Sequence, residues 1–254
     1  MIKEVYCNSR CAATVVFEMA IESSLSLLHS SKRPCCFRRA VLGWTAAVLL
    51  LAPMLGIAQD ASLNRDLLQA VRRGDEPVVR ALLEQGANPN SRNRLGDTPL
   101  NSAAKNNHTS LGLLLIERGA DVNIRNLSGI SPLMGAAFNG NLPLVRALLV
   151  RHADLSPVDR VKKTAAVYAA GNGHADVLGL LLDAGVAVDA RYDNDVTALM
   201  WAAAYGKEDT VRLLIRRGAD VGARDNRGKT AADMAEEGGH RATVELLRHA
   251  ATGS

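Results

Sequence analysis

Small and apolar residues recur along this chain at a fixed interval of 33 residues, from about residue 64 to residue 249. In each interval a Leu or another apolar residue precedes a pair of small residues at helical spacing, so the three share one helix face. A second, Leu-rich stretch follows. The pattern predicts two short helices per interval, and each pair must stack on its neighbours to bury its apolar side. The small pairs are Ala103-Ala104, Ala136-Ala137, Ala169-Ala170 and Ala202-Ala203.

Polar residues and glycines mark where these helices begin and end. A Ser or Thr hydroxyl can accept a hydrogen bond from the first turn of a helix, and proline fits the next position because it has no N–H to leave unpaired. Glycine ends the second helix because it adopts the left-handed conformation at no steric cost. His152 takes that place once, at an expected cost of about 1 kcal/mol. The expected first residues are Thr98, Ser131, Thr164, Thr197 and Thr230, and the expected terminating glycines are Gly86, Gly119, Gly185 and Gly218.

These columns resemble the ankyrin repeat, with its Thr-Pro-Leu-His start, alanine pair, Leu-Leu helix and Gly-Ala-Asp ending. The resemblance implies an all-α solenoid of helix pairs joined by β-hairpin fingers, over residues 59–254. The units span about 64–93, 94–126, 127–159, 160–192, 193–225 and 226–249.

One column departs from the family, because the histidine of the start is replaced in every unit. We therefore expect its hydrogen-bond network to be absent. The replacing residues are Asn101, Met134, Val167, Met200 and Asp233.

Residues 1–58 have the layout of a leader with a secretory signal. Basic residues, Arg38 and Arg39 among them, precede an uncharged apolar segment at 40–55, and small residues follow at Gly56 and Ala58. This order predicts cleavage after Ala58, a mature chain that begins at Gln59, and export to the periplasm. Three alternatives stay open. An uncleaved segment would anchor the protein in the inner membrane, the arginine pair would suit twin-arginine export, and translation could start at Met19.

Removal of the leader changes the composition. All four cysteines lie before residue 59, so the expected mature chain has neither a disulfide framework nor a cysteine metal site. Of the 30 basic and 26 acidic residues, 24 and 23 remain, which leaves a net charge of +1. Because phosphate binding needs a strong positive excess, nucleic acid is a poor candidate partner.

No constellation for catalysis is recognisable in the repeats. A catalytic or metal centre needs several groups that converge on one point, whereas the repeat spreads the candidates apart. His108, His174 and His240 occupy one column two units apart, too far to share a metal ion. We expect no enzyme activity, no cofactor and no metal.

The aromatic residues suggest where a partner binds. In ankyrin-like stacks the fingers and the first helices line a concave surface, as the resemblance implies. Four of the five aromatic residues after residue 58 lie on first helices, on the face away from the alanine pairs, and Tyr192 lies in a finger. Central aromatics commonly anchor binding, although such rings can also fill grooves between helices. The four on first helices are Phe138, Tyr168, Trp201 and Tyr205.

Charge on the fingers adds a second signal. The fingers, residues 91–97, 124–130, 157–163, 190–196 and 223–229, hold ten basic and five acidic residues. This excess would steer an acidic partner, unless the arginines simply solvate the loops. Lys162 and Asp195 replace the finger glycine of the other units, so we expect altered turns there. One arginine column recurs at Arg92, Arg125, Arg191 and Arg224.

Together these features predict a non-catalytic, periplasmic scaffold that binds a protein partner, which the charge suggests is acidic, on its concave face. Contact with a membrane is expected only if the leader is uncleaved. Two alternatives belong to other classes. The aromatics could stack on envelope carbohydrate or a small molecule, or the protein could be a membrane-anchored structural element.

Overall fold

The structure is a computed structural model that describes residues 61–252. The predicted leader, its apolar segment at 40–55 and the cleavage position after Ala58 lie outside these residues. The chain divides into a unit Met1–Ile57 and a unit Ala58–Ser254, and all elements described belong to the second unit.

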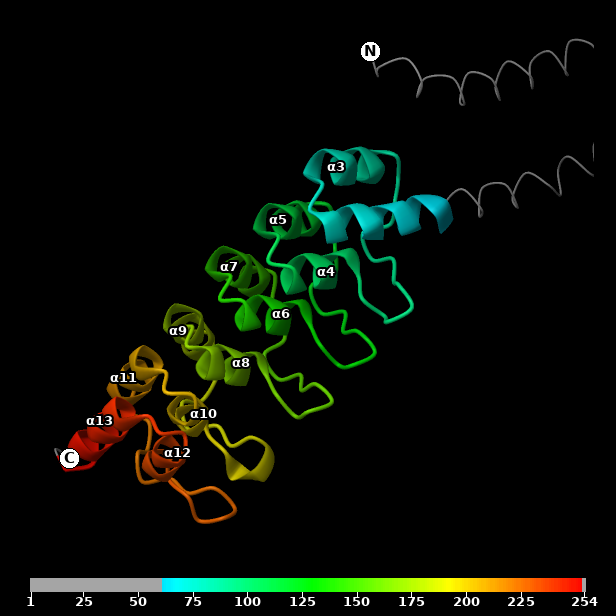
Figure 1. Cartoon of the computed structure of the whole chain (residues 1–254). Helices are drawn as coiled ribbons and strands as arrows, with labels where there is room; N and C mark the ends of the chain where they lie inside the picture. Colours follow the sequence, from blue (N-terminus) through cyan, green and yellow to red (C-terminus); the bar gives the residue numbers. More distant parts are fainter. Residues whose placement is uncertain (1–60, 253–254) are drawn as a thin grey trace, which may run out of the picture. The chain divides into compact units, whose positions relative to one another are not determined.

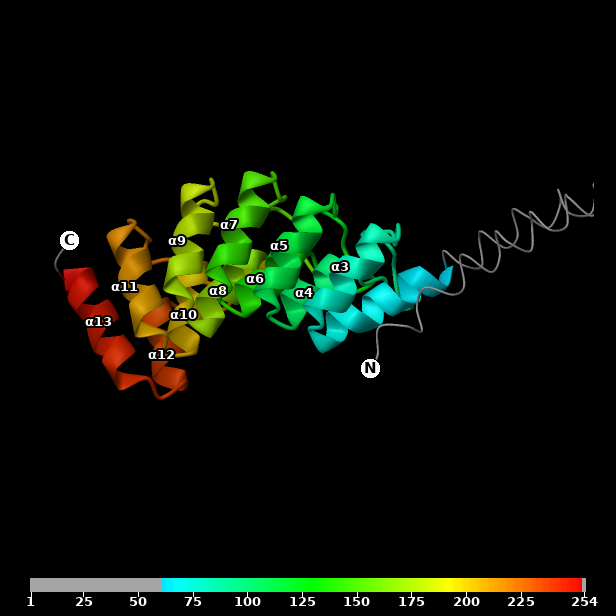
Figure 2. The ribbon, with the colours of Figure 1, turned by 90° about the horizontal axis from the view of Figure 1, so that it is seen from above.

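Pairs of antiparallel helices stack along this unit (Figure 1). One row holds the first helix of each pair and the other row holds the second, and each helix packs on the next of its row, as Figures 1 and 2 show. The all-α solenoid is confirmed, and no β-strand occurs within 61–252. The fingers that were expected as β-hairpins are therefore loops without strands, because each chain reversal is too short for paired extended arms, and they project to one side. The first helices are residues 61–73, α4 (Pro99–Lys105), α6 (Pro132–Phe138), α8 (Ala165–Asn172), α10 (Ala198–Ala204) and α12 (Ala231–Glu237). The second helices are α3 (Glu76–Glu84), α5 (Thr109–Glu117), α7 (Leu142–Val150), α9 (Ala175–Asp183), α11 (Glu208–Arg216) and α13 (Arg241–Thr252).

The first helices begin where the hydroxyl column predicts. The Thr98 Oγ1 accepts a hydrogen bond from the Asn101 N–H at 3.1 Å, and the Ser131 Oγ accepts one from the Met134 N–H at 3.2 Å. The same cap recurs at α8, α10 and α12. Each cap satisfies a donor that the helix itself cannot pair, which contributes about 1 kcal/mol.

A continuous apolar core runs between the two rows. All eight alanines of the predicted pairs are fully buried, and Leu100, Leu133 and Leu199 are at most 1% exposed. Small side chains let neighbouring first helices approach closely. At Gly135, for example, an added Cβ would lie 3.3 Å from the Cβ of Ala104 in the preceding repeat. Replacing a buried leucine such as Leu133 with alanine would cost about 2–5 kcal/mol.

The second helices end as predicted. Gly86, Gly119, Gly185 and Gly218 have φ between 82° and 110°, and His152 adopts φ 58° at the same place. The left-handed histidine predicted from the sequence is therefore confirmed.

The expectation that the family histidine's network is absent is wrong in one repeat. The Asn101 Nδ2 donates to the Ile124 carbonyl at 3.0 Å, because its amide has a donor that can reach the next finger. Asp233 instead folds back on the Thr230 N–H and hydroxyl of its own helix start. A bond to the next finger thus forms at Asn101, whose amide carries a donor, whereas the side chains of Met134, Val167 and Met200 carry none.

Candidate partner-binding face

Four of the five fingers share one conformation, and in each of them the side chain at the same position of the repeat holds the loop. The Asp159 Oδ1 accepts hydrogen bonds from the Val161 and Lys163 N–H groups, both at 2.9 Å. A backbone bond from the Asp159 N–H to the Lys163 carbonyl, 3.1 Å, closes the loop. The equivalent residues in three other fingers make the same pair of side-chain bonds, and they are Asn93, Asn126 and Asp225.

The fourth finger differs because Tyr192 occupies this column and offers no such acceptor. Its tip, Asp193–Asp195, forms a short 3-10 turn in which Asn194 and Asp195 both have left-handed φ values of 60° and 61°. The predicted altered turn is therefore confirmed at Asp195. At Lys162 it is wrong, because Lys162 adopts φ 60° within a regular finger whose aspartate is present.

Four aromatic side chains form a band across three successive first helices. Phe138 and Tyr168 meet edge to face with their ring centroids 5.7 Å apart, and Trp201 stacks on Tyr205 at 6.0 Å with an interplanar angle of 9°. The Lys163 ammonium joins the two pairs, because its Nζ lies 4.4 Å from the centroid of Trp201 and 5.6 Å from that of Tyr168. We call Phe138, Tyr168, Lys163, Trp201 and Tyr205 the aromatic band.

Exposure separates the members of this band. Phe138 and Tyr205 are each 51% exposed, whereas Tyr168 and Trp201 are half-buried against the core. Tyr205 also covers Gly171 of α8, where an added Cβ would lie 3.5 Å from the tyrosine ring. Tyr168 and Trp201 therefore fill the grooves between helices and also support two rings that remain accessible.

The Tyr168 hydroxyl connects the band to the third finger. It donates a hydrogen bond to the Oδ2 of the buried Asp159, whose other oxygen holds the turn. Burial raises the pKa of Tyr168, and the hydrogen bond to Asp159 and the negative charge of that carboxylate raise it further. The band is thus fixed in place by the finger beside it.

A groove of about 500 Å³ lies beside the band, between the third, fourth and fifth fingers. Tyr192, Val196 and Trp201 provide its apolar lining, and Lys162 and Arg227 are among its polar residues. Tyr192 is half-buried and hydrogen-bonds to the Thr164 side chain at the start of α8. The pKa of Tyr192 is raised by burial, which the bond to Thr164 partly offsets.

The predicted arginine column divides into two groups. The Arg191 Nη1 donates to the Arg224 carbonyl at 3.1 Å, and the Arg224 Nη1 donates to the Gly228 carbonyl at 2.6 Å. These two guanidinium groups therefore support finger backbone as well as carrying charge. Arg92 and Arg125 are exposed on the first two fingers and do not line the groove beside the aromatic band. The structure thus does not bring all the predicted site residues together.

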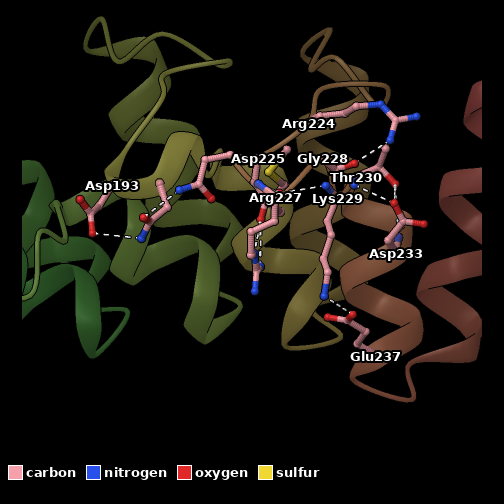
Figure 3. Close-up of polar contacts among 12 residues, drawn as sticks. Asp193, Arg224, Asp225, Arg227, Gly228, Lys229, Thr230, Asp233 and Glu237 are labelled. Atoms are coloured by element: carbon pink, nitrogen blue, oxygen red, sulfur yellow. Dashed lines mark hydrogen bonds and ion pairs between the residues drawn. The ribbon is translucent and has the colours of Figure 1, made fainter.

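Figure 3 shows the fifth finger, where charged groups pair with one another. The Arg227 Nη2 lies 2.9 Å from the Asp225 Oδ2, and Lys229 pairs with Glu237 of α12. Burial would raise the pKa of Asp225, but hydrogen bonds from the Lys229 and Arg227 N–H groups and the Arg227 side chain lower it overall. Part of the finger charge counted in the sequence is therefore neutralised within the protein.

The histidine column has a packing role. An added Cβ on Gly140 would lie 2.4 Å from the His174 Nδ1, and one on Gly206 would lie 2.5 Å from the His240 Nδ1. Each ring covers a glycine of the preceding repeat, and the His174 Nε2 also lies 3.0 Å from the Phe138 carbonyl. Within residues 61–252 no three histidine, cysteine or acidic side chains gather as ligands for a metal ion.

Asp159 and Lys163 were not among the site residues predicted from sequence. The signal for Asp159 was present, since Asn93, Asn126, Asp159 and Asp225 recur at the 33-residue interval. Nothing in the sequence places the Lys163 ammonium over two rings, because that contact depends on how the finger lies against α8 and α10.

A model of ankyrin repeats, built for three copies, matches the chain at residues 45–126, 67–159, 133–225 and 169–253. The chain is also similar to a Caenorhabditis elegans homolog of transient receptor potential cation channel subfamily A member 1, with 38% identity over 80 residues. That match covers 32% of this chain and 6% of the channel homolog. No helix within 61–252 has the length and apolar character required to cross a membrane. The match to the family model spans most of the sequence, and the chain belongs to the ankyrin-repeat family.

Proposed function

We propose that this protein is a non-catalytic scaffold that binds a protein partner on its concave face, formed by the fingers and the first helices. Ankyrin repeats are general protein–protein interaction modules, and the family is typically non-catalytic. The fold alone does not select a partner. The choice of face therefore depends on the side chains that the repeats carry there.

The observation that carries this proposal is the accessible part of the aromatic band. Phe138 and Tyr205, each 51% exposed, are large apolar side chains that water contacts in the free protein. The Tyr168 ring packs against Phe138, and the Trp201 ring packs against Tyr205. These contacts fix the positions of the two exposed rings before a partner binds. Rigid, central aromatic side chains typically contribute most to the binding energy of an interface.

Charge on the neighbouring fingers supports an acidic partner. The third finger carries three basic residues against the single carboxylate of Asp159. Asp159 is buried and bonded to its own loop, whereas Arg160 and Lys162 are exposed. An exposed positive edge raises the association rate of an acidic surface, and this effect weakens with added salt.

Export to the periplasm belongs to the same proposal. Its support is the order of basic residues, apolar segment and small residues in the leader. The mass of the N-terminal peptide of the protein from cells tests it. A chain that begins at Gln59 supports cleavage and export, and an intact 40–55 segment supports anchoring in the inner membrane instead.

Binding can be tested with a double substitution. Trp201→Ala with Tyr205→Ala removes one stacked pair, and we expect a loss of at least about 2 kcal/mol, or about 30-fold in Kd, for partners captured from an envelope extract. Val150→Ala is the matched control, because Val150 is 71% exposed but ends α7 in the row of second helices. Unchanged affinity in the double variant would contradict the proposal. Circular dichroism verifies that both variants keep their helices.

A further inference from the structure

We propose that the groove lined by the third, fourth and fifth fingers binds an extended acidic segment of the partner protein at the junction of the third and fourth fingers, with an apolar side chain of that segment against Tyr192 and Trp201. This inference depends on the proposed function and specifies one part of the concave face.

The first observation is a gap in the backbone contacts that join neighbouring finger tips. The Leu127 N–H donates to the Leu95 carbonyl, the Arg160 N–H to the Ser128 carbonyl and the Asn226 N–H to the Asn194 carbonyl, each at 3.0 Å. The fourth contact of this series would join the Asp193 N–H to the Val161 carbonyl. In the described part of the chain no hydrogen bond joins them. Two backbone groups at the edge of the groove thus have no partner across the junction.

A second series of contacts is interrupted at the same junction. At the base of the fingers, the Asn90 and Asn123 side chains accept hydrogen bonds from the Asp121 and Asp154 N–H groups, at 2.8 and 2.9 Å. Asp189 repeats the contact at the base of the fourth finger, where it accepts a hydrogen bond from the Asp220 N–H. Ser156 occupies the equivalent place in the third finger, and within residues 61–252 it makes no bond to Ala187 across the junction. The third and fourth fingers are therefore the pair least tied to each other.

Tyr192 accounts for the gap at the finger tips. Because it replaces the Asn or Asp that folds the other fingers, the tip of the fourth finger turns through Asn194 and Asp195 with left-handed φ values. This turn moves Asp193 out of the series. The Tyr192 ring then lines the groove that opens. One residue thus creates both the unpaired edge and the apolar lining.

The shape and lining of the groove suit a peptide. Its volume of about 500 Å³ lies within the range typical of ligand sites, roughly 300–1,000 Å³. Tyr192, Val196 and Trp201 can bury an apolar side chain. The unpaired N–H of Asp193 and C=O of Val161 match the acceptor and donor of an extended main chain, as in peptide binding at a sheet edge.

Charge selects an acidic segment. The third and fifth fingers each carry a net charge of +2 and the fourth carries −1, which sums to +3. Because Lys229 pairs with Glu237 of α12, the three fingers keep a positive charge of +2. Lys162 lines the groove and forms no ion pair with any described carboxylate. The Arg227 side chain is 59% exposed, although it pairs with Asp225. A carboxylate beside the inserted apolar residue would pair with Lys162, which Asp193 of the same lining leaves without an ion pair.

The test uses a phage-displayed library of random linear peptides, panned on the full chain. We expect enriched peptides to carry Asp or Glu next to a large apolar residue. Lys162→Gly should weaken their binding about 10-fold, because it removes the charge, and glycine fits the φ of 60° at this position. Arg94→Ala is the matched control, since Arg94 is an exposed cation on the first finger, and it should leave binding unchanged.

A second variant tests the gap itself. Tyr192→Asn combined with Asp195→Gly restores the residues found in the second finger, Asn126 and Gly129, and should close the groove. We expect the enriched peptides to lose binding by about 100-fold or more, and the Asp193 amide to become protected from hydrogen exchange. Tyr192→Phe, which keeps the ring, should bind within about twofold of the parent chain.

Several outcomes would overturn this inference, and the first four concern the peptides and the groove. They are the absence of any enriched peptide, enrichment of peptides without acidic residues, binding that persists in the restored finger, and groove-dependent binding of cell-wall glycan fragments in place of peptides. If enriched peptides depend on Trp201 and Tyr205 but not on Lys162 or Tyr192, the protein-binding function stands and the groove is not the site. If the double aromatic variant retains every captured partner, the proposed function itself fails.

Discussion

The third finger, residues 157–163, and the fourth, residues 190–196, both lack the glycine that the other fingers place at Gly96, Gly129 and Gly228. The third finger nevertheless keeps the regular turn, with Lys162 at φ 60°. The fourth does not, and a second residue, Asn194, also becomes left-handed. The two loops differ at one position: Asp159 of the third finger accepts hydrogen bonds from the N–H groups of its turn, whereas Tyr192 of the fourth finger offers no such acceptor.

This comparison shows that the carboxamide or carboxylate at the base of the finger has more influence on its conformation than the glycine at its tip. Asp159 accepts two backbone bonds at 2.9 Å, and these outweigh the steric cost of one left-handed lysine. Without such an acceptor the tip folds in another way and leaves a groove. The fourth finger, which departs from the repeated conformation, also lines the candidate binding groove.

The largest expected effect comes from removal of that acceptor. Asp159→Ala leaves the Val161 and Lys163 N–H groups and the Tyr168 hydroxyl without their partner. We therefore expect the free energy of unfolding, measured in urea, to fall by about 2–3 kcal/mol. Asp159→Asn is the control, because Asn93 and Asn126 show that an amide oxygen holds the same turn. If both variants lose equal stability, the acceptor does not hold the finger.

A smaller effect should follow when the missing glycine is restored. Lys162→Gly removes the steric cost of a left-handed lysine in an otherwise regular turn. We therefore expect the free energy of unfolding to rise by about 0.5–1 kcal/mol. Asp195→Gly should gain less, because aspartate tolerates this conformation better than lysine does. Thermal unfolding of the two variants side by side measures the difference. A larger gain at Asp195 would mean that strain, and not the missing acceptor, distorts the fourth finger.

The smallest effect concerns the ionisation of the two tyrosines. The pKa of Tyr168 is raised above its usual value of 10.0 by burial and then by Asp159, whereas burial alone raises that of Tyr192. A tyrosine whose pKa rises on folding stabilises the fold fully below about pH 10, and this contribution is lost as the pH rises toward the folded pKa. Tyrosinate absorbance should show that Asp159→Asn lowers the pKa of Tyr168 only. An equal change at Tyr192 would indicate a general loosening of the fold.

Much of this structure can be predicted from the sequence because the same residue types recur at equivalent positions of several repeats. The helix starts at Thr98 and Thr197, the buried alanine pairs and the left-handed His152 all follow from local rules that need no knowledge of the neighbours. The aromatic column was also visible, and so was the adjacency of Trp201 and Tyr205, which lie one helical turn apart. The leader remains a prediction, since it lies outside the described residues.

What could not be predicted depends on particular side-chain contacts, some within one finger and some between repeats. The sequence suggests that Lys162 disturbs its finger, but the bonds accepted by Asp159 keep the turn regular. It likewise suggests that the histidine network is lost, whereas the Asn101 amide reaches the Ile124 carbonyl of the next finger. Net finger charge overstates the free charge, because Arg227 and Lys229 pair with Asp225 and Glu237.

The sequence by itself determined the architecture. It repeats every 33 residues with helical spacing inside each repeat, and stacking the resulting helix pairs buries their apolar faces. Only the tertiary structure decided how the fingers differ from one another in their contacts. The placement of Lys163 over Trp201 and the open junction at Val161 and Asp193 arise from how one loop lies against the next. Such contacts depend on side-chain geometry between repeats, which a one-dimensional period does not encode.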